Sequence, residues 1–390
     1  MMATSPARKK RRAIVGNGSA SWQDGAVTGR DTQAVEMEPQ AVWPPGAGAP
    51  AFQLLDVRAP IEVQKHALPG AKNLPILTDA ERHEVGACYH QRGHDAAVEL
   101  GVALTEPHRA ARVAAWQEAI ASSSTPTAMT CWRGGDRSAI AQRWLGSAVP
   151  RVRGGAKALR RYLMAALDEQ LASRRFLVVA GLTGSGKTEA LHAVAKAALG
   201  DVHVLDLEAF AHHRGSAFGG HGQQQPAQAT FENRVAASLL LSPASLVLVE
   251  DEARHVGRVL LPKELWQRVK SAPVALLDGP DDERVARIAT EYVFEPSRAT
   301  PRVEVKERLL GSIRKLHKRL GGQMAQMCEA AVEAADQGDT WFSVDAHAPW
   351  IRPLLVDYYD HHYRQELARY PREVAWQGDI PGLVDWLSRR

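Results

Sequence analysis

The sequence predicts an α/β protein with two sheet-containing units and an α-helical C-terminal region. Short apolar runs that end in polar residues recur between residues 52 and 277, with helical patterns between them, as in parallel sheets. One run leads into a glycine-rich segment followed by a helical pattern, and after about residue 303 only helical patterns recur. The predicted divisions are a flexible tail over residues 1–50, α/β domains over 51–168 and 169–302, and a helical region over 303–390.

Composition narrows the class of protein. The chain has 390 residues, of which 45% are hydrophobic and 24% charged, and this excludes global disorder and a coiled-coil rod. The net charge of +4 does not by itself indicate nucleic-acid binding, and three cysteines are too few for a disulfide framework. No apolar run reaches the roughly 18 residues that a membrane span needs, and no signal-peptide pattern opens the sequence. We therefore expect a cytoplasmic protein without membrane association.

The first 50 residues lack the apolar periodicity of a helix or strand. A basic run occupies residues 9–12, and proline, glycine and alanine fill residues 44–50. We interpret most of this segment as a flexible tail. Its basic run is either a solvated terminal charge cluster or a contact for RNA.

The first α/β unit carries a cysteine at the end of a predicted strand. Strands are predicted over residues 52–58 and 127–130, and the second delivers Cys131 into a loop that precedes a helix over 140–145. The positive end of that helix favours a thiolate, and Arg133 and Arg137 are suited to hold an oxyanion beside it. The alternative is a buried structural cysteine.

The second unit carries a phosphate-binding motif. Residues 181–188 match G-x-x-x-x-G-K-[ST] after a predicted strand over 175–180. The loop amides and Lys187 would hold a diphosphate, and Thr188 could ligate Mg²⁺. Asp251 follows another predicted strand and is our choice for the metal-side carboxylate, with Glu250 as the alternative. The motif does not identify the phosphate compound. The predicted phosphate-binding set is Gly181, Gly184, Gly186, Lys187, Thr188 and Asp251.

One C-terminal helix combines an apolar face with basic residues. Over residues 308–320, Leu309, Ile313, Leu316 and Leu320 share a face. The basic residues either contact RNA phosphates or form an ordinary solvated surface. They are Arg314, Lys315, Lys318 and Arg319.

The cysteine loop and the segments before it resemble the rhodanese family. Residues 56–58, Glu62, residues 67–75 and the loop opened by Cys131 and closed by Arg137 carry the resemblance. It implies that Cys131 transfers sulfane sulfur or its selenium analogue. A rhodanese-like domain would then precede a domain of the P-loop NTPase type.

Over about residues 52–388 the chain resembles the tRNA 2-selenouridine synthase family. The resemblance rests on the two loops and on further segments around them. These are residues 56–62, 85–89, 154–160, 213–219, 231–233 and 250–254.

This resemblance implies a transferase that acts on the wobble 2-thiouridine of tRNA. The sulfur first accepts a geranyl group from geranyl diphosphate, and selenium from selenophosphate then replaces the S-geranyl group through a Cys131 selenyl-sulfide. Arg133 and Arg137 would bind the phosphate of selenophosphate, and we expect the phosphate loop to hold geranyl diphosphate, with Mg²⁺ as a further candidate ligand. An enzyme that supplies selenophosphate is a candidate partner.

Other residues have two interpretations. Cys88 is either a relay thiol for Cys131 or a buried small side chain. His213, Arg214 and Ser216 either contact RNA or the diphosphate, or are locally satisfied polar groups. Two functions compete with the transferase: a rhodanese-type sulfurtransferase with a nucleotide-binding P-loop domain, and a regulatory nucleotide-binding module.

Overall fold

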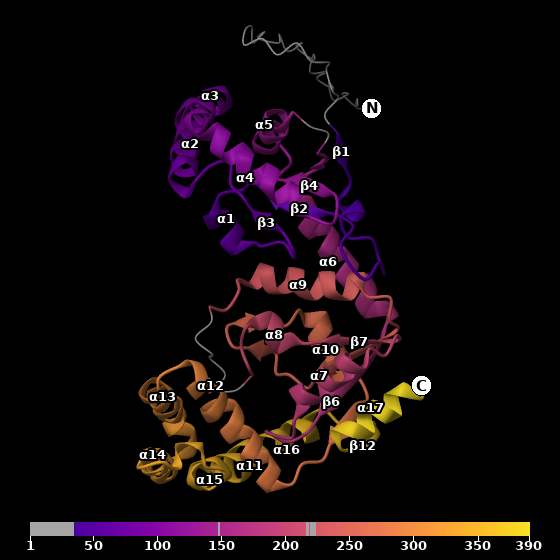
Figure 1. Cartoon of the computed structure of the whole chain (residues 1–390). Helices are drawn as coiled ribbons and strands as arrows, with labels where there is room; N and C mark the ends of the chain where they lie inside the picture. Colours follow the sequence, from indigo (N-terminus) through magenta and orange to yellow (C-terminus); the bar gives the residue numbers. More distant parts are fainter. Residues whose placement is uncertain (1–34, 147–148, 216–217, 219–223) are drawn as a thin grey trace, which may run out of the picture. The chain divides into compact units, whose positions relative to one another are not determined.

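The computed structural model describes residues 35–146, 149–215, 218 and 224–390. Two five-stranded parallel sheets form its framework, and each is flanked by helices (Figure 1). The predicted mixed α/β class with parallel sheets is confirmed. Within the described residues, no helix is both long and apolar enough to cross a bilayer.

The first sheet has the strand order β1-β5-β4-β2-β3. Its strands are β1 (Glu36–Met37), β2 (Gln53–Asp56), β3 (Lys72–Asn73), β4 (Thr127–Thr130) and β5 (Arg151–Val152). The helices of this part are α1 (Pro60–Lys65), α2 (Asp79–Arg92), α3 (His94–Thr105), α4 (Arg109–Ala121), α5 (Asp136–Leu145) and α6 (Gly155–Ser173), with short 3₁₀ turns at Pro39–Ala41 and Glu106–His108. The central strands β2 and β4 are short and almost fully buried, and each places two apolar residues in the core.

The second sheet has the order β12-β11-β6-β8-β7. Its strands are β6 (Arg175–Ala180), β7 (Val202–Leu205), β8 (Leu246–Glu250), β11 (Val274–Leu277) and β12 (Val374–Gly378), and a separate hairpin joins β9 (His255–Val256) to β10 (Val259–Leu260). The accompanying helices are α7 (Lys187–Ala197), α8 (Leu207–Ala211), α9 (Gln228–Leu241), α10 (Lys263–Ser271) and α17 (Ile380–Ser388).

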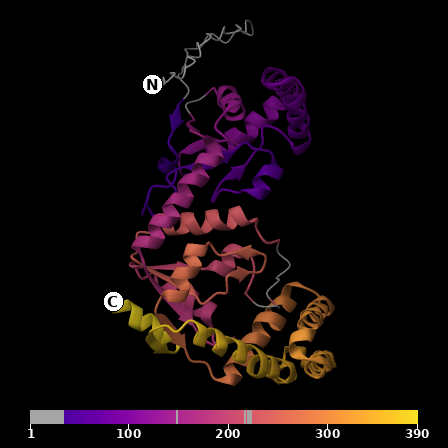
Figure 2. The ribbon, with the colours of Figure 1, turned by 180° about the vertical axis from the view of Figure 1, so that it is seen from behind.

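A group of helices with its own apolar core follows β11, and Figure 2 shows this group from behind. Its α-helices are α11 (Asp281–Ala289), α12 (Glu295–Ala299), α13 (Arg302–Leu320), α14 (Gly322–Ala335), α15 (Val344–Pro353) and α16 (Asp360–Arg369). A 3₁₀ turn lies at Thr340–Phe342, and π-helical turns lie at Thr290–Phe294 and Leu354–Tyr359. Its core packs leucines of α13, small and thiol side chains of α14, Trp341 of the 3₁₀ turn and Trp350 of α15.

Three predictions about the divisions of the chain differ from the structure. The flexible tail was expected to reach residue 50, but Val42 and Trp43 are fully buried and β1 pairs with β5. The basic run over residues 9–12 lies outside the described residues. The C-terminal region was expected to be wholly α-helical, but β12 returns to the second sheet beside β11. The predicted boundary between residues 168 and 169 falls inside α6.

Candidate functional site

Cys131 lies at the carboxyl end of β4, where the sequence placed it. Its Sγ is 3.2 Å from the Ser138 Oγ and 3.9 Å from the Gly135 carbonyl oxygen. Helix α5 begins at Asp136, so its positive end faces this loop. The first turn of α6 holds the loop from the other side, because the Ala156 N–H donates to the Cys131 carbonyl at 2.8 Å. Strand β4, its loop and helix α5 therefore hold the Cys131 thiol at the carboxyl edge of the first sheet.

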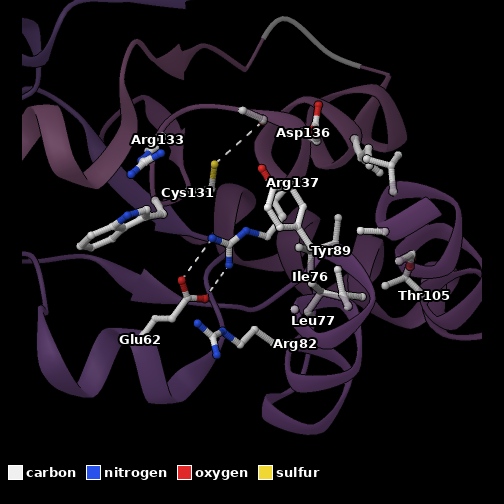
Figure 3. Close-up of a pocket in the computed structure, with 18 of the residues that line it drawn as sticks. Glu62, Ile76, Leu77, Arg82, Tyr89, Thr105, Cys131, Arg133, Asp136 and Arg137 are labelled. Atoms are coloured by element: carbon white, nitrogen blue, oxygen red, sulfur yellow. Dashed lines mark hydrogen bonds and ion pairs between the residues drawn. The ribbon is translucent and has the colours of Figure 1, made fainter. Parts of the chain in front are cut away.

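The two predicted arginines occupy different environments. Arg137 makes a two-pronged ion pair with Glu62, whose oxygens are 2.5 Å and 3.1 Å from its Nη atoms (Figure 3). Burial raises the pKa of Glu62, but the Arg137 pairing outweighs it and leaves this pKa below its ordinary value. The same carboxylate raises the pKa of Arg137. Arg133 is exposed and lines the same cavity, as does Arg82, which the sequence analysis did not single out.

The cavity beside Cys131 has a volume of about 800 Å³. Cations and Glu62 lie near the thiol, whereas Ile76, Leu77 and Tyr89 lie toward α2 and α3 (Figure 3). The sequence predicted the thiol and its arginines but not this apolar wall. Ile76 and Leu77 belong to the segment before α2, whereas Tyr89 lies on α2 itself. Neither element carries a chemical motif, and the segment over residues 85–89 was the one available signal.

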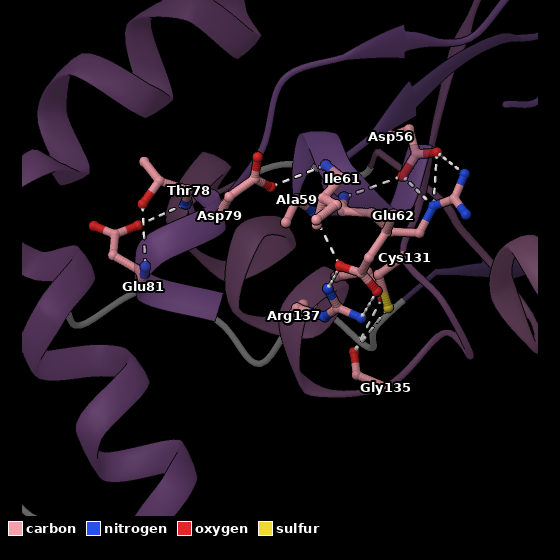
Figure 4. Close-up of polar contacts among 12 residues, drawn as sticks. Asp56, Ala59, Ile61, Glu62, Thr78, Asp79, Glu81, Cys131, Gly135 and Arg137 are labelled. Atoms are coloured by element: carbon pink, nitrogen blue, oxygen red, sulfur yellow. Dashed lines mark hydrogen bonds and ion pairs between the residues drawn. The ribbon is translucent and has the colours of Figure 1, made fainter. Parts of the chain in front are cut away.

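A buried ion pair stiffens the strand that leads to α1. Arg58 Nη2 lies 2.5 Å from Asp56 Oδ2, and both side chains have no exposed surface. Figure 4 shows Asp56 near the Glu62–Arg137 pair and Cys131. Arg58 also donates to the His66 carbonyl at 2.9 Å. These contacts fix the start of α1 and so the position of Glu62.

Cys88 lies on α2, is buried, and is a free thiol. Val85, Gly86 and Tyr89 on the same helix line the Cys131 cavity, but Cys88 does not. The structure therefore places it behind the cavity wall, and a relay role stays a prediction. Cys328, on α14, is fully buried within the helical core.

The phosphate-loop motif connects β6 to α7. Gly184 and Gly186 have φ values of +80° and +90°, which lets the loop turn back toward the start of α7. Lys187 Nζ donates to the Gly181 carbonyl at 3.0 Å. Thr188 occupies the first turn of α7. The strand, loop and helix expected for such a motif are therefore present.

Asp251 does not have the environment predicted for a metal-side carboxylate. Its two oxygens contact Lys270 Nζ at 3.0 Å and Arg372 Nη2 at 2.6 Å, and all three side chains are almost fully buried. The Tyr363 hydroxyl also donates to it at 3.1 Å. These partners lower the pKa of Asp251 even though burial raises it. Asp251 therefore has a structural role: through Arg372 it holds the residues just before β12 in place.

The alternative carboxylate, Glu250, belongs to an acidic cluster. Carboxylate oxygens of Glu208, Glu250 and Glu252 all lie within 4.8 Å of one another. Burial raises the pKa of Glu252 to about 8, and burial together with Glu208 and Glu252 raises that of Glu250 well above its ordinary value. Glu250 Oε1 is buried and makes no hydrogen bond. Close, buried oxygen ligands of this kind fit Mg²⁺.

Tyr363, from α16, is a loop contact that the sequence analysis missed. Its hydroxyl accepts from the Gly181 N–H at 2.9 Å, and Lys187 Nζ lies 5.8 Å from its ring centre. Burial raises its pKa. The residue is far from the motif in sequence, so only the fold brings it here.

Of the remaining predicted contacts, His213 and Lys315 line one pocket between the segment after α8 and helix α13. The His213 N–H donates to the Glu208 carbonyl, and Arg214 pairs with Glu291. Ser216 lies outside the described residues. On α13 the apolar face is buried as predicted, and Arg314 pairs with Glu329 of α14. Lys315, Lys318 and Arg319 are exposed.

Residues 174–390 match the family model of the tRNA 2-selenouridine synthase AAA domain. A tRNA 2-selenouridine synthase of Bordetella bronchiseptica is 41% identical over 355 residues, covering 86% of this chain and 93% of the relative. The chain belongs to the tRNA 2-selenouridine synthase family. A synthase of Cupriavidus necator is 40% identical, with 86% and 93% coverage. The match to such synthases spans nearly all of the described residues, so it includes both the Cys131 loop and the phosphate loop.

Proposed function

We propose that this protein converts wobble 2-thiouridine of tRNA into 2-selenouridine in two steps. Geranyl diphosphate first alkylates the sulfur, and selenium from selenophosphate then replaces the S-geranyl group. The observation that carries the proposal is the presence, in one chain of this family, of a cysteine loop with its own cavity and a phosphate loop with its own acidic cluster. Each step needs one of these sites.

The first α/β unit is proposed to be rhodanese-like and to handle selenium. Selenophosphate carries selenium at the selenide level, so a selenyl-sulfide on Cys131 would need an oxidant. In the balanced step the Cys131 thiolate attacks phosphorus, the phosphorus–selenium bond breaks, and selenide leaves with the electron pair to replace the S-geranyl group. Water then releases phosphate and restores the thiol. Arg133 and Arg82, exposed at the cavity, supply positive charge for the phosphate of selenophosphate. Arg137 is ion-paired with Glu62, so it contributes less positive charge to phosphate binding than the sequence predicted.

The phosphate loop is proposed to bind the diphosphate of geranyl diphosphate. When the uridine sulfur bonds to the geranyl carbon, the carbon–oxygen bond breaks and diphosphate leaves with the electron pair, which Lys187 stabilises.

Mg²⁺ is proposed to bind at Glu208, Glu250 and Glu252 rather than at Asp251. When bound, it would neutralise charge on a diphosphate. Glu250 and Glu252 would hold it through carboxylate oxygens, and the raised pKa of Glu252 implies that binding releases protons at neutral pH.

The tRNA is proposed to contact the exposed basic residues of α13. Lys315, Lys318 and Arg319 offer point charges that RNA phosphates bind with strong salt dependence. An enzyme that makes selenophosphate is the proposed source of the second substrate.

The test is nucleoside mass spectrometry on an anticodon stem-loop that contains 2-thiouridine. Wild type with geranyl diphosphate, selenophosphate, Mg²⁺ and dithiothreitol should yield 2-selenouridine. Cys131→Ala should stop at the geranylated nucleoside, whereas Lys187→Ala should leave 2-thiouridine unchanged. Cys328→Ala and Lys196→Ala, which replace a core thiol and an exposed lysine of α7, are the matched controls and should behave as wild type. If wild type alters no nucleoside but transfers sulfur from thiosulfate to cyanide, the sulfurtransferase alternative replaces this proposal.

A further inference from the structure

We propose that the apolar wall of the Cys131 cavity binds the alkyl chain carried by the sulfur of the substrate nucleoside. The inference rests on the proposed function and adds a location for the S-geranyl group during selenium exchange. The cavity would then hold both reacting partners, with the selenium donor at its cationic side and the hydrocarbon chain at its apolar side.

The lining of the cavity has a charged part and an apolar part. Arg133, Arg137 and Glu62 lie beside the thiol, and Arg82 of α2 lies next to Glu62. The apolar wall is formed by Ile76 and Leu77 before α2, Val85 on α2, Ala97 and Val98 on α3, and Ile140 on α5. Ile76, Leu77 and Ala97 are almost fully buried and anchor this wall in the core, whereas Val85, Val98 and Ile140 are half-buried and offer surface to the cavity.

Small sulfur or selenium donors do not explain the apolar wall. Selenophosphate and thiosulfate are compact anions that need cations and N–H groups, which the Cys131 loop already provides. The volume of about 800 Å³ lies in the range of sites that bind drug-sized organic molecules. A ten-carbon chain attached to a base uses this space, whereas a five-atom anion leaves most of it as apolar surface in contact with water.

The polar groups of the wall are already bonded or lie at the mouth. The Thr105 hydroxyl donates to the Gly101 carbonyl at 2.7 Å. His94 Nε2 lies 3.0 Å from Asp136 Oδ2, and the side chains of both are more than half exposed. A base or a sugar would find few partners along this wall, and a hydrocarbon chain needs none.

The location also fits the chemistry of exchange. A carbon–selenium bond forms at C2 of the base, the carbon–sulfur bond breaks, and geranylthiol leaves with the electron pair and takes up a proton. Because the wall and Cys131 border one cavity, the departing chain stays in apolar surroundings while selenium enters from the thiol side.

The test starts from stem-loops that already carry S-alkyl-2-thiouridine, so that the phosphate-loop step is bypassed. Methyl, dimethylallyl and geranyl derivatives are compared with selenophosphate and dithiothreitol, and kcat/KM for 2-selenouridine formation is measured. Each buried methylene adds a factor of about four, so wild type should prefer geranyl over methyl by at least roughly a hundredfold.

Two variants on α3 locate the chain. Val98→Trp fills the wall and should reduce the geranyl preference over methyl at least tenfold, with little effect on the methyl substrate. Val102→Trp is the matched control, because Val102 lies on the same helix, is 38% exposed and does not line the cavity. It should retain the wild-type preference.

The outcomes separate the two proposals. If wild type converts none of the S-alkyl substrates, the proposed function itself fails. If wild type converts methyl and geranyl substrates with equal kcat/KM, the function stands and the wall does not bind the chain. The same conclusion follows if Val98→Trp, verified as folded by circular dichroism, keeps the wild-type preference. The chain-length series on wild type decides the matter even if Val98→Trp does not fold.

Discussion

Replacing Gly155 by alanine should damage the cysteine site without touching the phosphate loop. Gly155 has φ +60° at the start of α6, and an added Cβ would lie less than 3.0 Å from the Cys131 carbonyl oxygen, the Gly134 nitrogen and the Arg133 nitrogen. The left-handed conformation costs alanine about 1–2 kcal/mol. The clash adds about 1–3 kcal/mol unless the Cys131 loop moves. A displacement of about 1 Å is enough to lower a rate roughly a hundredfold.

Gly146→Ala is the matched control for Gly155→Ala. Gly146 ends α5 with φ +59°, and an added Cβ would meet no atom within 4 Å. It should show the backbone cost alone in urea unfolding and keep selenium exchange on a geranylated stem-loop. Gly155→Ala should lose that exchange roughly a hundredfold while its geranylation of 2-thiouridine persists. Equal selenium exchange in the two variants would refute the argument that α6 positions the Cys131 loop.

Three further outcomes are expected. Asp251→Asn leaves two buried cations without their anion and should lower the free energy of unfolding in urea by about 3–5 kcal/mol. If stability is unchanged and geranylation no longer depends on Mg²⁺, Asp251 is a metal ligand after all. Glu252 has a pKa of about 8 in the folded protein, so its contribution destabilises wild type progressively as pH rises from about 4.5 to 8. Glu252→Gln should therefore stabilise the protein at about pH 8.5 but not near pH 4.5, and a uniform effect in urea titrations would contradict this. Glu62→Gln removes a carboxylate beside Arg137 and should lower the KM for selenophosphate roughly fivefold; a higher KM would mean that the carboxylate mainly orients the arginine.

The sequence located both loops because their signals are local. A strand, a loop with fixed residue types and a helix occupy contiguous positions, and both Cys131 and Lys187 lie where such units place them. The structure favours Glu250, the alternative named from the sequence, over Asp251. Strand β8 ends at Glu250, and the Glu252 N–H donates to the Glu250 carbonyl at 2.9 Å, so the chain turns here and both glutamates lie close to Glu208. Local strand patterns do not predict this turn.

Other features depend on partners distant in the sequence. Trp43 is buried in a segment rich in proline and glycine, because the Tyr162 hydroxyl donates to its carbonyl and Gly46 bonds to the Leu240 carbonyl. Strand β12 begins at Val374, which is 53% exposed, so it lacks the continuous apolar run of a central strand. Local sequence patterns predict neither the burial of Trp43 nor the strand β12.

Helix α6 has a consequence for anyone who divides this chain into fragments. Its N-terminal turn holds the Cys131 loop, while Leu163 and Leu167 farther along are buried in the core that also contains Phe231 of α9. A fragment that begins at residue 174, where the AAA family match starts, would lose this helix and leave the apolar face of α9 in water. This uncovered apolar surface would cause such a fragment to aggregate. Fragments that carry the phosphate loop should therefore retain α6 from Gly155 onward.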